Sequence, residues 1–459
     1  MLNTIIDKTT ILKYDVQGPR YTSYPTAPEW SADINARIYK EKLAELGRSP
    51  KSISLYIHVP FCEQLCYFCA CMKVIRTNEE RHGEEYLEHL FKEIELVASA
   101  IGSKRTVKQF HWGGGTPTFL SEVQIERLFQ KVSRHFAIDM DGEIAIEVDP
   151  RTVTASKLAV LRRVGFNRIS MGVQDFDEKV MHAVNRIQPF DMVKSVTDEC
   201  RRLKFHSVNF DLIYGLPHQS RDSFEKTIEL VLGLRPDRIA LYSFAYVPWL
   251  QKHQSKLDQS IFPNNDIKLD IFLAARQKFL DHGYQAIAMD HFALTSDEMA
   301  KAFNEDRLYR NFMGYTVKPA DEYIGLGVSA IGFLENTFVQ NVKALPDYYQ
   351  ALEHGKLPVE RGKLLSEDDI IRRWVILQLM CHFKISKKEF NQVFGQDFDQ
   401  YFDSEHAHLM KCVEDGLISK TEEGIKATEL GQLFIRNVCM GFDAYLRKGN
   451  GKQRFSRTV

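Results

Sequence analysis

The decisive stretch of this sequence runs Leu55-Tyr-Ile-His-Val-Pro-Phe-Cys62-Glu-Gln-Leu-Cys66-Tyr-Phe-Cys69-Ala-Cys71. It leaves the end of a predicted strand and enters a loop in which Cys62, Cys66 and Cys69 have the spacing C-x-x-x-C-x-x-C. With only eight cysteines in 459 residues, random placement would rarely produce this triplet. The spacing therefore predicts a site built from three thiolates at the end of a strand.

Three other kinds of site could use these cysteines. A structural zinc site joins two separated knuckles, and the sequence offers neither a second cysteine pair nor a nearby histidine pair to complete one. A thioredoxin-like C-x-x-C at Cys66 and Cys69 leaves Cys62 without a role and has no helix directly behind it. A four-thiolate electron carrier would also need Cys71, which lies too close to Cys69 to reach a separate corner easily. We therefore interpret Cys62, Cys66 and Cys69 as the ligands of a [4Fe-4S] cluster.

Three thiolates on a four-iron cubane leave one iron without a protein ligand, and chemistry can occur there. The spacing resembles that of the radical S-adenosylmethionine (SAM) superfamily, whose clusters are sensitive to oxygen. The resemblance implies that the amino and carboxylate groups of SAM bind the fourth iron, and that one electron splits SAM into methionine and a 5′-deoxyadenosyl radical. The protein then has to position this cofactor and exclude oxygen and water.

Strand and helix patterns alternate between about residues 50 and 250. The predicted strands are 52–59, 107–112, 143–148, 168–173, 207–213 and 238–244, and the segments between them have helical periodicity. One of these helices should begin with a capping box at Ser121 and Gln124. Strand-helix units in series imply a parallel sheet, which can be doubly wound or curl into an open barrel. We expect an α/β fold with a partial (βα)6 TIM-like barrel.

The two ends of the chain have different patterns from the middle. The segment GPRYTSYPTAPEW (18–30) has three prolines, which exclude a long helix, so an extended arm over the surface is predicted. After Pro358 the pattern becomes helix-rich, with a capping pattern at Ser366 and Asp369 and a winged-helix-like stretch at 416–438. The predicted units are an N-terminal arm (1–48), a barrel with an extension (49–358) and a C-terminal domain (359–459). Because no basic stripe is present, we interpret the last unit as a packing or lid domain.

The composition excludes several classes of protein. The 60 basic and 61 acidic residues nearly cancel, so no global field attracts nucleic acid or an anionic membrane. Neither a secretory signal nor a run of about 18 apolar residues occurs, which predicts a cytoplasmic protein. The four remaining cysteines are expected to be core thiols: Cys200, Cys381, Cys412 and Cys439.

Further motifs at the strand ends could hold SAM. His111-Trp-Gly-Gly-Gly-Thr-Pro-Thr118 follows the second predicted strand, and its glycines let the backbone approach a ligand closely. In parallel barrels this end of the sheet is where sites are built. Glu147, Gln174 and Asp211 would accept hydrogen bonds from an ammonium and ribose hydroxyls, and Arg186 would meet a carboxylate. Each of them could instead be a satisfied buried polar group.

Nearly the whole chain resembles the oxygen-independent coproporphyrinogen III oxidases, also called coproporphyrinogen dehydrogenases. The motifs that carry the resemblance include GPRYTSYPTA, YIHVPFC with CYFCAC, HWGGGTPT, IEVDPR, FNRISMGVQDF, FDLIYGLP and RNVCMGFDAYL. The resemblance implies oxidative decarboxylation of two propionates of coproporphyrinogen III to vinyls, giving protoporphyrinogen IX in haem biosynthesis. It also implies two SAM molecules per monomer and an unidentified one-electron donor. We expect a monomer.

The resemblance also assigns individual residues. The first SAM would be held by Tyr56, Gly114, Gly115, Thr116, Glu147, Gln174 and Arg186; Asp211, Ala245 and Ile331 would complete the SAM sites, with Phe312 and Met313 near the second. Cys71 is counted with the cofactor-binding residues, and Tyr56 and Phe68 either pack on adenine or seal the loop. The substrate carries four carboxylates, and Arg20 in the arm is the leading candidate to bind one of them, although it could be a surface arginine. The family pattern has glutamine at the position of Met313, where a thioether cannot replace the hydrogen bonds of an amide.

Two related activities remain as alternatives. A haem chaperone would bind the cluster and haem without decarboxylation, but such relatives lack the GPRYTSYP arm and the cysteine at the position of Cys71. A haem-degrading radical SAM methyltransferase is the other.

Overall fold

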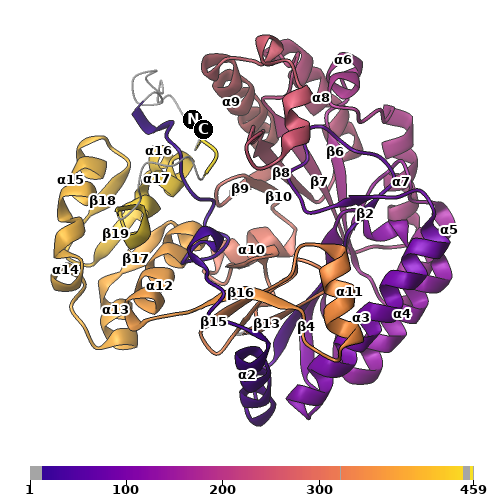
Figure 1. The fold of residues 1–459 in the computed structure, drawn as a ribbon. Helices are drawn as coiled ribbons and strands as arrows, with labels where there is room; N and C mark the ends of the chain where they lie inside the picture. Colours follow the sequence, from indigo (N-terminus) through magenta and orange to yellow (C-terminus); the bar gives the residue numbers. More distant parts are fainter. Residues whose placement is uncertain (1–12, 321, 448–454, 458–459) are drawn as a thin grey trace.

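The structure is a computed structural model that describes residues 13–320, 322–447 and 455–457. Its centre is a 12-stranded sheet (Figure 1). Six parallel strands form the middle of this sheet: β1 (Ile53–Val59), β4 (Thr106–Gly114), β5 (Ala137–Val148), β6 (Arg168–Gln174), β7 (Ser207–Tyr214) and β8 (Arg238–Ser243). All six predicted strands are confirmed, most of them within one or two residues and β5 with an earlier start.

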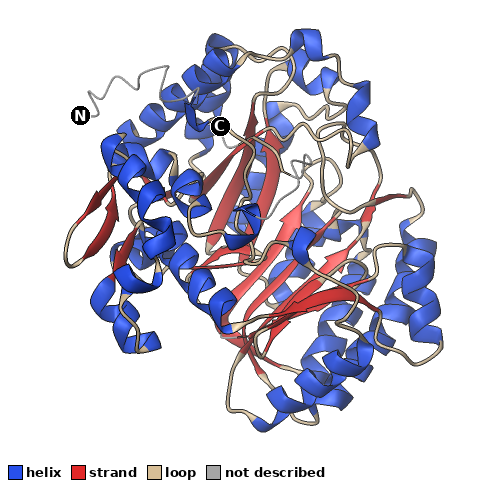
Figure 2. Cartoon of the chain, turned by 60° about the vertical axis from the view of Figure 1, so that its left-hand side comes forward, coloured by secondary structure: helices blue, strands red, loops and turns tan. Residues whose placement is uncertain are grey.

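The strands lie in the sheet in their order along the chain, β1-β4-β5-β6-β7-β8. A doubly wound sheet reverses its strand order at a switch point, whereas a constant order with right-handed crossovers places the helices on one face and curls the sheet. The partial barrel is therefore confirmed, and the helices lie outside it (Figures 1 and 2). They are α3 (Glu79–Ile101), α4 (Glu122–His135), α5 (Ala155–Val164), α6 (Glu178–Ala183), α7 (Phe190–Arg202), α8 (Arg221–Leu234) and α9 (Asn265–Asp281).

Both edges of the parallel sheet carry further strands. β13 (Glu322–Leu326) pairs with β1 in parallel, and β14 (Ile331–Leu334), β15 (Thr337–Asn341) and β16 (Val359–Leu364) continue the sheet antiparallel. At the other edge lie β10 (His291–Leu294) and β9 (Tyr284–Ile287). Smaller elements complete this part: α2 (Ala36–Arg48), β2 (Phe61–Cys62), β3 (Val74–Ile75), α10 (Glu298–Asn304), β11 (Tyr309–Asn311), β12 (Gly314–Thr316) and α11 (Leu345–Glu353).

The barrel helices begin where their capping residues predict. Ser121 and Gln124 form the expected capping box of α4, in which Ser121 Oγ accepts from Gln124 N and Gln124 Oε1 accepts from Ser121 N. Apolar side chains at helical spacing, such as Leu128 and Val132, are fully buried between α4 and the sheet. They join a core that contains Phe110, Trp112 and Phe166 in edge-to-face contact.

The C-terminal region is helix-rich, as predicted, and lies beside the barrel (yellow and orange in Figure 1). Its capping box at Ser366 and Asp369 opens α12. A three-stranded sheet with the order β17-β19-β18 contains the predicted strand pair. The elements are α12 (Glu367–His382), β17 (Lys384–Ser386), α13 (Lys387–Phe394), α14 (Phe398–Tyr401), α15 (His406–Glu414), β18 (Ile418–Lys420), β19 (Gly424–Ala427), α16 (Glu429–Leu433), α17 (Ile435–Met440) and α18 (Ala444–Arg447).

The N-terminal arm is extended but it does not lie on the surface. Tyr14, Tyr21 and Tyr24 are buried in the apolar core of the C-terminal region, because an arm rich in aromatic residues gains more by burial than by exposure. The exact unit boundaries at residues 48 and 358 stay predictions. Cys200, Cys381, Cys412 and Cys439 are buried thiols, as expected. Within the described residues, no helix is both long enough and apolar enough to cross a membrane.

Candidate active site

The cysteine loop is fixed at the carboxyl end of the barrel by the strands on either side. β2 and β3 pair and close the base of the loop, with Arg76 N donating to Cys62 O at 2.9 Å. The glycine-rich turn after β4 lies directly against it, because Gly115 N donates to Val59 O and Thr116 N to Phe61 O. The two motifs that lie about 50 residues apart in the sequence therefore form one surface.

Hydrogen-bond donors surround the predicted ligand sulfurs. Thr116 Oγ1 lies 3.4 Å from Cys62 Sγ, and the guanidinium groups of Arg151 and Arg186 lie 3.4 and 3.5 Å from Cys66 Sγ. Donors of this kind stabilise negative charge on thiolates. Burial raises the pKa of Cys62 to about 11, which cluster formation has to overcome.

Cys69 and Cys71 influence each other's ionisation. The contact between their thiols lowers the pKa of Cys69 and raises the pKa of Cys71 well above its ordinary value. These directions favour Cys69 over Cys71 as the thiolate, and the ligand assignment itself stays a prediction.

Across residues 13–320, 322–447 and 455–457, no group of three cysteine, histidine or acidic side chains is arranged to hold a single metal ion. The assignment of Cys62, Cys66 and Cys69 as cluster ligands stays a prediction.

The three consecutive glycines have three different close neighbours. A Cβ at Gly113 would lie 2.8 Å from Glu147 Oε1, one at Gly114 would lie 2.8 Å from the His58 ring, and one at Gly115 would lie 2.5 Å from Pro60 O. Gly114 also has φ +119°, which side chains rarely adopt. The motif thus lets the turn, the strand β1 and Glu147 approach one another.

Two adjoining cavities open beside the cysteine loop. The first has a volume of about 370 Å³ and the second about 380 Å³, within the range of small-molecule sites. Cys71, Gly114 and Glu147 line both. Most predicted site residues line the first cavity: Cys62, Cys66, Phe68, Cys69, Cys71, Gly114, Gly115, Thr116, Glu147, Gln174, Arg186 and Asp211. Tyr56, Phe312, Met313 and Ile331 line the second.

Sheet register brings the polar residues of the first cavity together. Glu147 pairs with Ser170 across β5 and β6, and Gly172 pairs with Asp211 across β6 and β7. Glu147 also accepts a hydrogen bond from Gly114 N at 3.1 Å. Burial and the nearby charge of Glu147 raise the pKa of Asp211 to about 6.

Two buried polar atoms of this cavity have no partner within the protein. Gln174 Oε1 and Arg186 Nε are both buried without a hydrogen bond, and Gln174 has φ +67° at a bulge of β6. Buried polar atoms are normally paired, and backbone strain of this type is concentrated at functional sites. The cavity therefore has an acceptor and a cation placed for a polar ligand.

The second cavity is more apolar. Phe312, Met313 and Ile331 form one side, and the Met313 thioether replaces the amide expected from the resemblance. Tyr56 donates its hydroxyl hydrogen to His58 Nδ1 at 3.1 Å, while His58 Nε2 contacts Met72 O. Burial lowers the pKa of His58 to about 4, so the ring is neutral and can accept from Tyr56.

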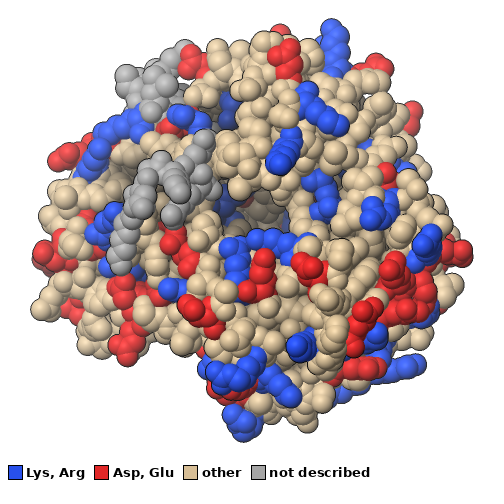
Figure 3. Space-filling view, in the orientation of Figure 1, with Lys and Arg blue, Asp and Glu red and all other residues tan. Residues whose placement is uncertain are grey.

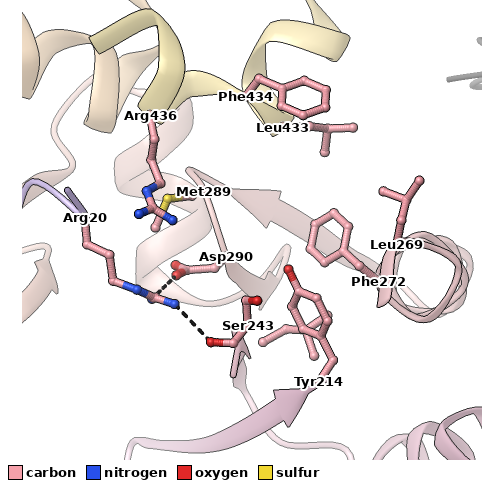
Figure 4. Close-up of a pocket in the computed structure, with 11 residues that line it drawn as sticks. Arg20, Tyr214, Ser243, Leu269, Phe272, Met289, Asp290, Leu433, Phe434 and Arg436 are labelled. Carbon is pink, nitrogen blue, oxygen red and sulfur yellow. Dashed lines mark hydrogen bonds and ion pairs between the residues drawn. The ribbon is translucent and has the colours of Figure 1, made fainter. Parts of the chain in front are cut away.

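Two predicted site residues lie outside both cavities. Ala245 follows β8, and its carbonyl accepts a hydrogen bond from Gln254 Nε2 at 3.1 Å. Arg20 reaches into a separate small cavity between β8, α9 and α17 (Figure 4), where it forms an ion pair with Asp290 at 3.2 Å. Its guanidinium also lies 5.5 Å from the ring of Tyr242, which lines the first cavity. Arg20 is thus a partly buried residue rather than a surface arginine, one side chain away from the first cavity.

Asp149 and Arg151 also line the first cavity, although they were not predicted from the sequence. Asp149 accepts hydrogen bonds from Arg151 at 2.7 Å and from Arg186 at 3.2 Å, and both arginines reach Cys66. Against the effect of burial, these two cations lower the pKa of Asp149 to about 2. The motif IEVDPR (146–151), which includes Glu147 and the end of β5, was the available signal.

Comparisons with known proteins agree with this geometry. Residues 56–231 match the model of the Radical SAM superfamily, and residues 365–434 match that of the HemN C-terminal domain. The oxygen-independent coproporphyrinogen III oxidase of a Synechocystis strain is 42% identical, covering 97% of each chain. That of Escherichia coli K12 is 41% identical, covering 99% of this chain and 98% of its own.

A solved structure matches the whole architecture. The coproporphyrinogen III oxidase HemN of Escherichia coli, described as a radical SAM enzyme, superimposes with a TM-score of 0.90 at 41% identity. The match covers 95% of this chain and 98% of that one, so it includes the barrel and the C-terminal region together.

Proposed function

This chain belongs to the family of oxygen-independent coproporphyrinogen III oxidases, and we propose that it converts coproporphyrinogen III to protoporphyrinogen IX by decarboxylating two propionate side chains. The full-length similarity to enzymes of that name supports this function. The single structural observation that carries it is the pair of adjoining cavities beside a loop with three cysteines.

A [4Fe-4S] cluster and SAM belong to this activity, and the residues present fit both. Cys62, Cys66 and Cys69 would hold the cluster, and the unpaired Gln174 Oε1 and Arg186 Nε would meet the polar groups of SAM. When bound, the reduced cluster and SAM supply the 5′-deoxyadenosyl radical that takes a hydrogen atom from the β-carbon of a propionate.

The residues of this chain would bind and orient SAM and shield the site from water. Glu147 and Asp211 lie on neighbouring strand ends, where two carboxylates suit an ammonium and ribose hydroxyls. Phe68 lines the first cavity, and the apolar side chains of the second limit the access of water.

We further propose that the second cavity holds a second SAM. Its volume matches that of the first, and the shared residues Cys71, Gly114 and Glu147 would lie between the two molecules. Met313 offers an apolar contact there, so the second molecule should bind more weakly than the first.

Arg20 is proposed to bind one carboxylate of the substrate. The face in Figure 3 is hollowed near its centre, and lysine and arginine side chains lie around the hollow, which suits a substrate with four carboxylates. Asp290 already accepts from Arg20, so the substrate would have to share or displace that contact. A cytoplasmic location and a monomeric state stay predictions, the latter open to sedimentation analysis.

The test is an anaerobic incubation of the reconstituted protein with coproporphyrinogen III, SAM and a chemical reductant. We expect protoporphyrinogen IX and carbon dioxide in a ratio of one to two. Cleavage of SAM without decarboxylation would contradict the proposed function, and binding of haem without either reaction would favour a haem chaperone.

A further inference from the structure

A segment far from the cysteine loop in sequence holds that loop from outside. It follows β8 and covers residues 247–257; we name it the clamp. Gln251 Nε2 donates to Ala70 O at 2.9 Å, His253 Nε2 lies 2.8 Å from Cys69 O, and Gln254 Nε2 donates to Phe68 O at 2.9 Å. Three consecutive carbonyls of the cysteine loop are therefore bound by one short segment.

The clamp residues do not contribute to either cavity. Gln251, His253 and Gln254 line neither the first nor the second cavity and contact the cysteine loop through its backbone carbonyls. Gln254 is fully buried, and its side-chain oxygen accepts from Val247 N, which makes the clamp itself a rigid turn.

The outer surface of the clamp is apolar and basic. Trp249 and Leu250 are 40% and 64% exposed, which is unusual for two adjacent large apolar residues. Lys252 is exposed beside them, and the ammonium of Lys256 lies 5.2 Å from the ring of Tyr67 in the cysteine loop. The clamp contains no acidic residue, and the loop from Cys62 to Lys73 contains one, Glu63.

We propose that the clamp is the docking surface for an acidic protein that delivers one electron to the cluster. The proposal rests on the proposed function, which needs one electron for each SAM that is cleaved. The donor protein loses one electron and the cluster gains it, and no proton or bond changes at the interface. The exposed Trp249 and Leu250, together with the exposed Lys252 and Lys256 of the same segment, suit a partner that presents an apolar patch and carboxylates.

Charge complementarity favours this partner over a second copy of the chain. The chain has 60 basic and 61 acidic residues, so a second copy has no large net negative charge to steer it toward the lysines of the clamp, whereas a strongly acidic donor has one. An acidic donor would be steered to the clamp and held next to the three hydrogen-bonded carbonyls of the cluster loop.

The experiment measures the rate at which a reduced acidic flavodoxin reduces the reconstituted cluster. Stopped-flow absorbance monitors the reaction through the loss of the visible absorbance of the cluster. The variant carries Lys252→Glu and Lys256→Glu. We expect the wild-type rate to fall as ionic strength rises, and the variant to be slower by about tenfold or more at low salt. Photoreduction by deazaflavin, a small reductant that needs no docking, should be unchanged.

The matched control reverses two exposed lysines at the opposite end of the barrel strands, Lys104→Glu and Lys108→Glu. The cluster of this control should be reduced at the wild-type rate, because the two lysines lie away from the clamp. The control is matched because its net charge changes by the same amount as that of the clamp variant. An equal loss in both variants, or none in the clamp variant, would overturn the proposal. Leu250→Ser should weaken the complex without changing its salt dependence.

Failure of the docking proposal is distinguishable from failure of the proposed function. SAM cleavage and decarboxylation driven by deazaflavin report the function alone, whereas the flavodoxin rate reports the docking surface alone. An active enzyme whose clamp variant accepts electrons normally would refute only the docking surface.

Discussion

Replacing Arg151 with glutamine should make the cluster harder to reduce. The guanidinium of Arg151 lies 3.4 Å from Cys66 Sγ and donates three hydrogen bonds to Asp149, and the Arg151 side chain is 12% exposed. It is placed to stabilise the negative charge that an added electron brings to the cluster. Glutamine removes the cation while leaving a polar side chain that can still reach Asp149.

The magnitude follows from Coulomb's law. A cation about 6 Å from one added electron contributes about 2.8 kcal/mol at an effective dielectric constant of about 20. The carboxylate of Asp149 lies directly against the guanidinium and cancels most of this energy. A net effect of about 1 kcal/mol remains, which corresponds to a midpoint potential lower by about 40 mV, from 59 mV per decade for one electron.

The assay is a redox titration monitored by the electron paramagnetic resonance of the reduced cluster. Arg151→Lys keeps the charge and should shift the potential less, which separates charge from geometry. Asp149→Asn removes the opposing charge and should raise the potential, provided that iron analysis shows a full cluster. An unchanged potential in Arg151→Gln, or shifts of the same sign in Arg151→Gln and Asp149→Asn, would refute the reasoning.

The remaining predictions address the ligands, the second cavity, the arm and the core. Cys71→Ala should retain a full cluster by iron and sulfide analysis whereas Cys69→Ala should not; the reverse result would show that the ligand assignment is wrong. Met313→Gln should tighten the weaker of two SAM binding steps in anaerobic equilibrium dialysis, because it restores a neutral hydrogen bond of about 0.5 to 1.5 kcal/mol; one SAM per cluster in both proteins would contradict the second site. Arg20→Ala should weaken binding of coproporphyrinogen III about tenfold or more through loss of a charge-assisted contact of about 1.5 to 3 kcal/mol, with the cluster spectrum unchanged; unchanged affinity would leave Arg20 with a structural role. Burial raises the pKa of Glu93 to about 7, although Gly327 N, Asn341 Nδ2 and Tyr348 Oη donate hydrogen bonds to its carboxyl group. Its contribution to stability is therefore full at a pH below the ordinary carboxyl pKa and is lost as the pH rises through about 7. The free energy of unfolding measured with urea should fall by up to about 3 kcal/mol between acidic pH and pH 8 in the wild type but not in Glu93→Gln, and the same pH dependence in both proteins would contradict the assignment.

The sequence by itself determined the local features of this protein. The spacing of Cys62, Cys66 and Cys69 indicated the cluster, since a loop of eight residues can present three thiolates only locally. Strand periodicity located all six parallel strands, and the capping residue Ser121 located the start of α4, because both depend on neighbours along the chain. The resemblance added the activity and, in the second cavity, Phe312, Met313 and Ile331.

Only the tertiary structure decided what depends on contacts between distant segments. The motif IEVDPR marks Arg151 in the sequence but does not reveal its partner, since the contact with Cys66 spans 85 positions and requires β1 and β5 to end at the same edge of the sheet. The burial of Tyr21 and Tyr24 against the C-terminal region could not be predicted, because proline content restricts the backbone of the arm and says nothing of what covers it. The clamp likewise meets the cysteine loop across more than 180 positions, where sheet topology and not local pattern brings Gln251 and Ala70 together. The spacing of residues along the chain predicts sites formed within one loop, whereas contacts between distant side chains depend on which strands are neighbours in the sheet.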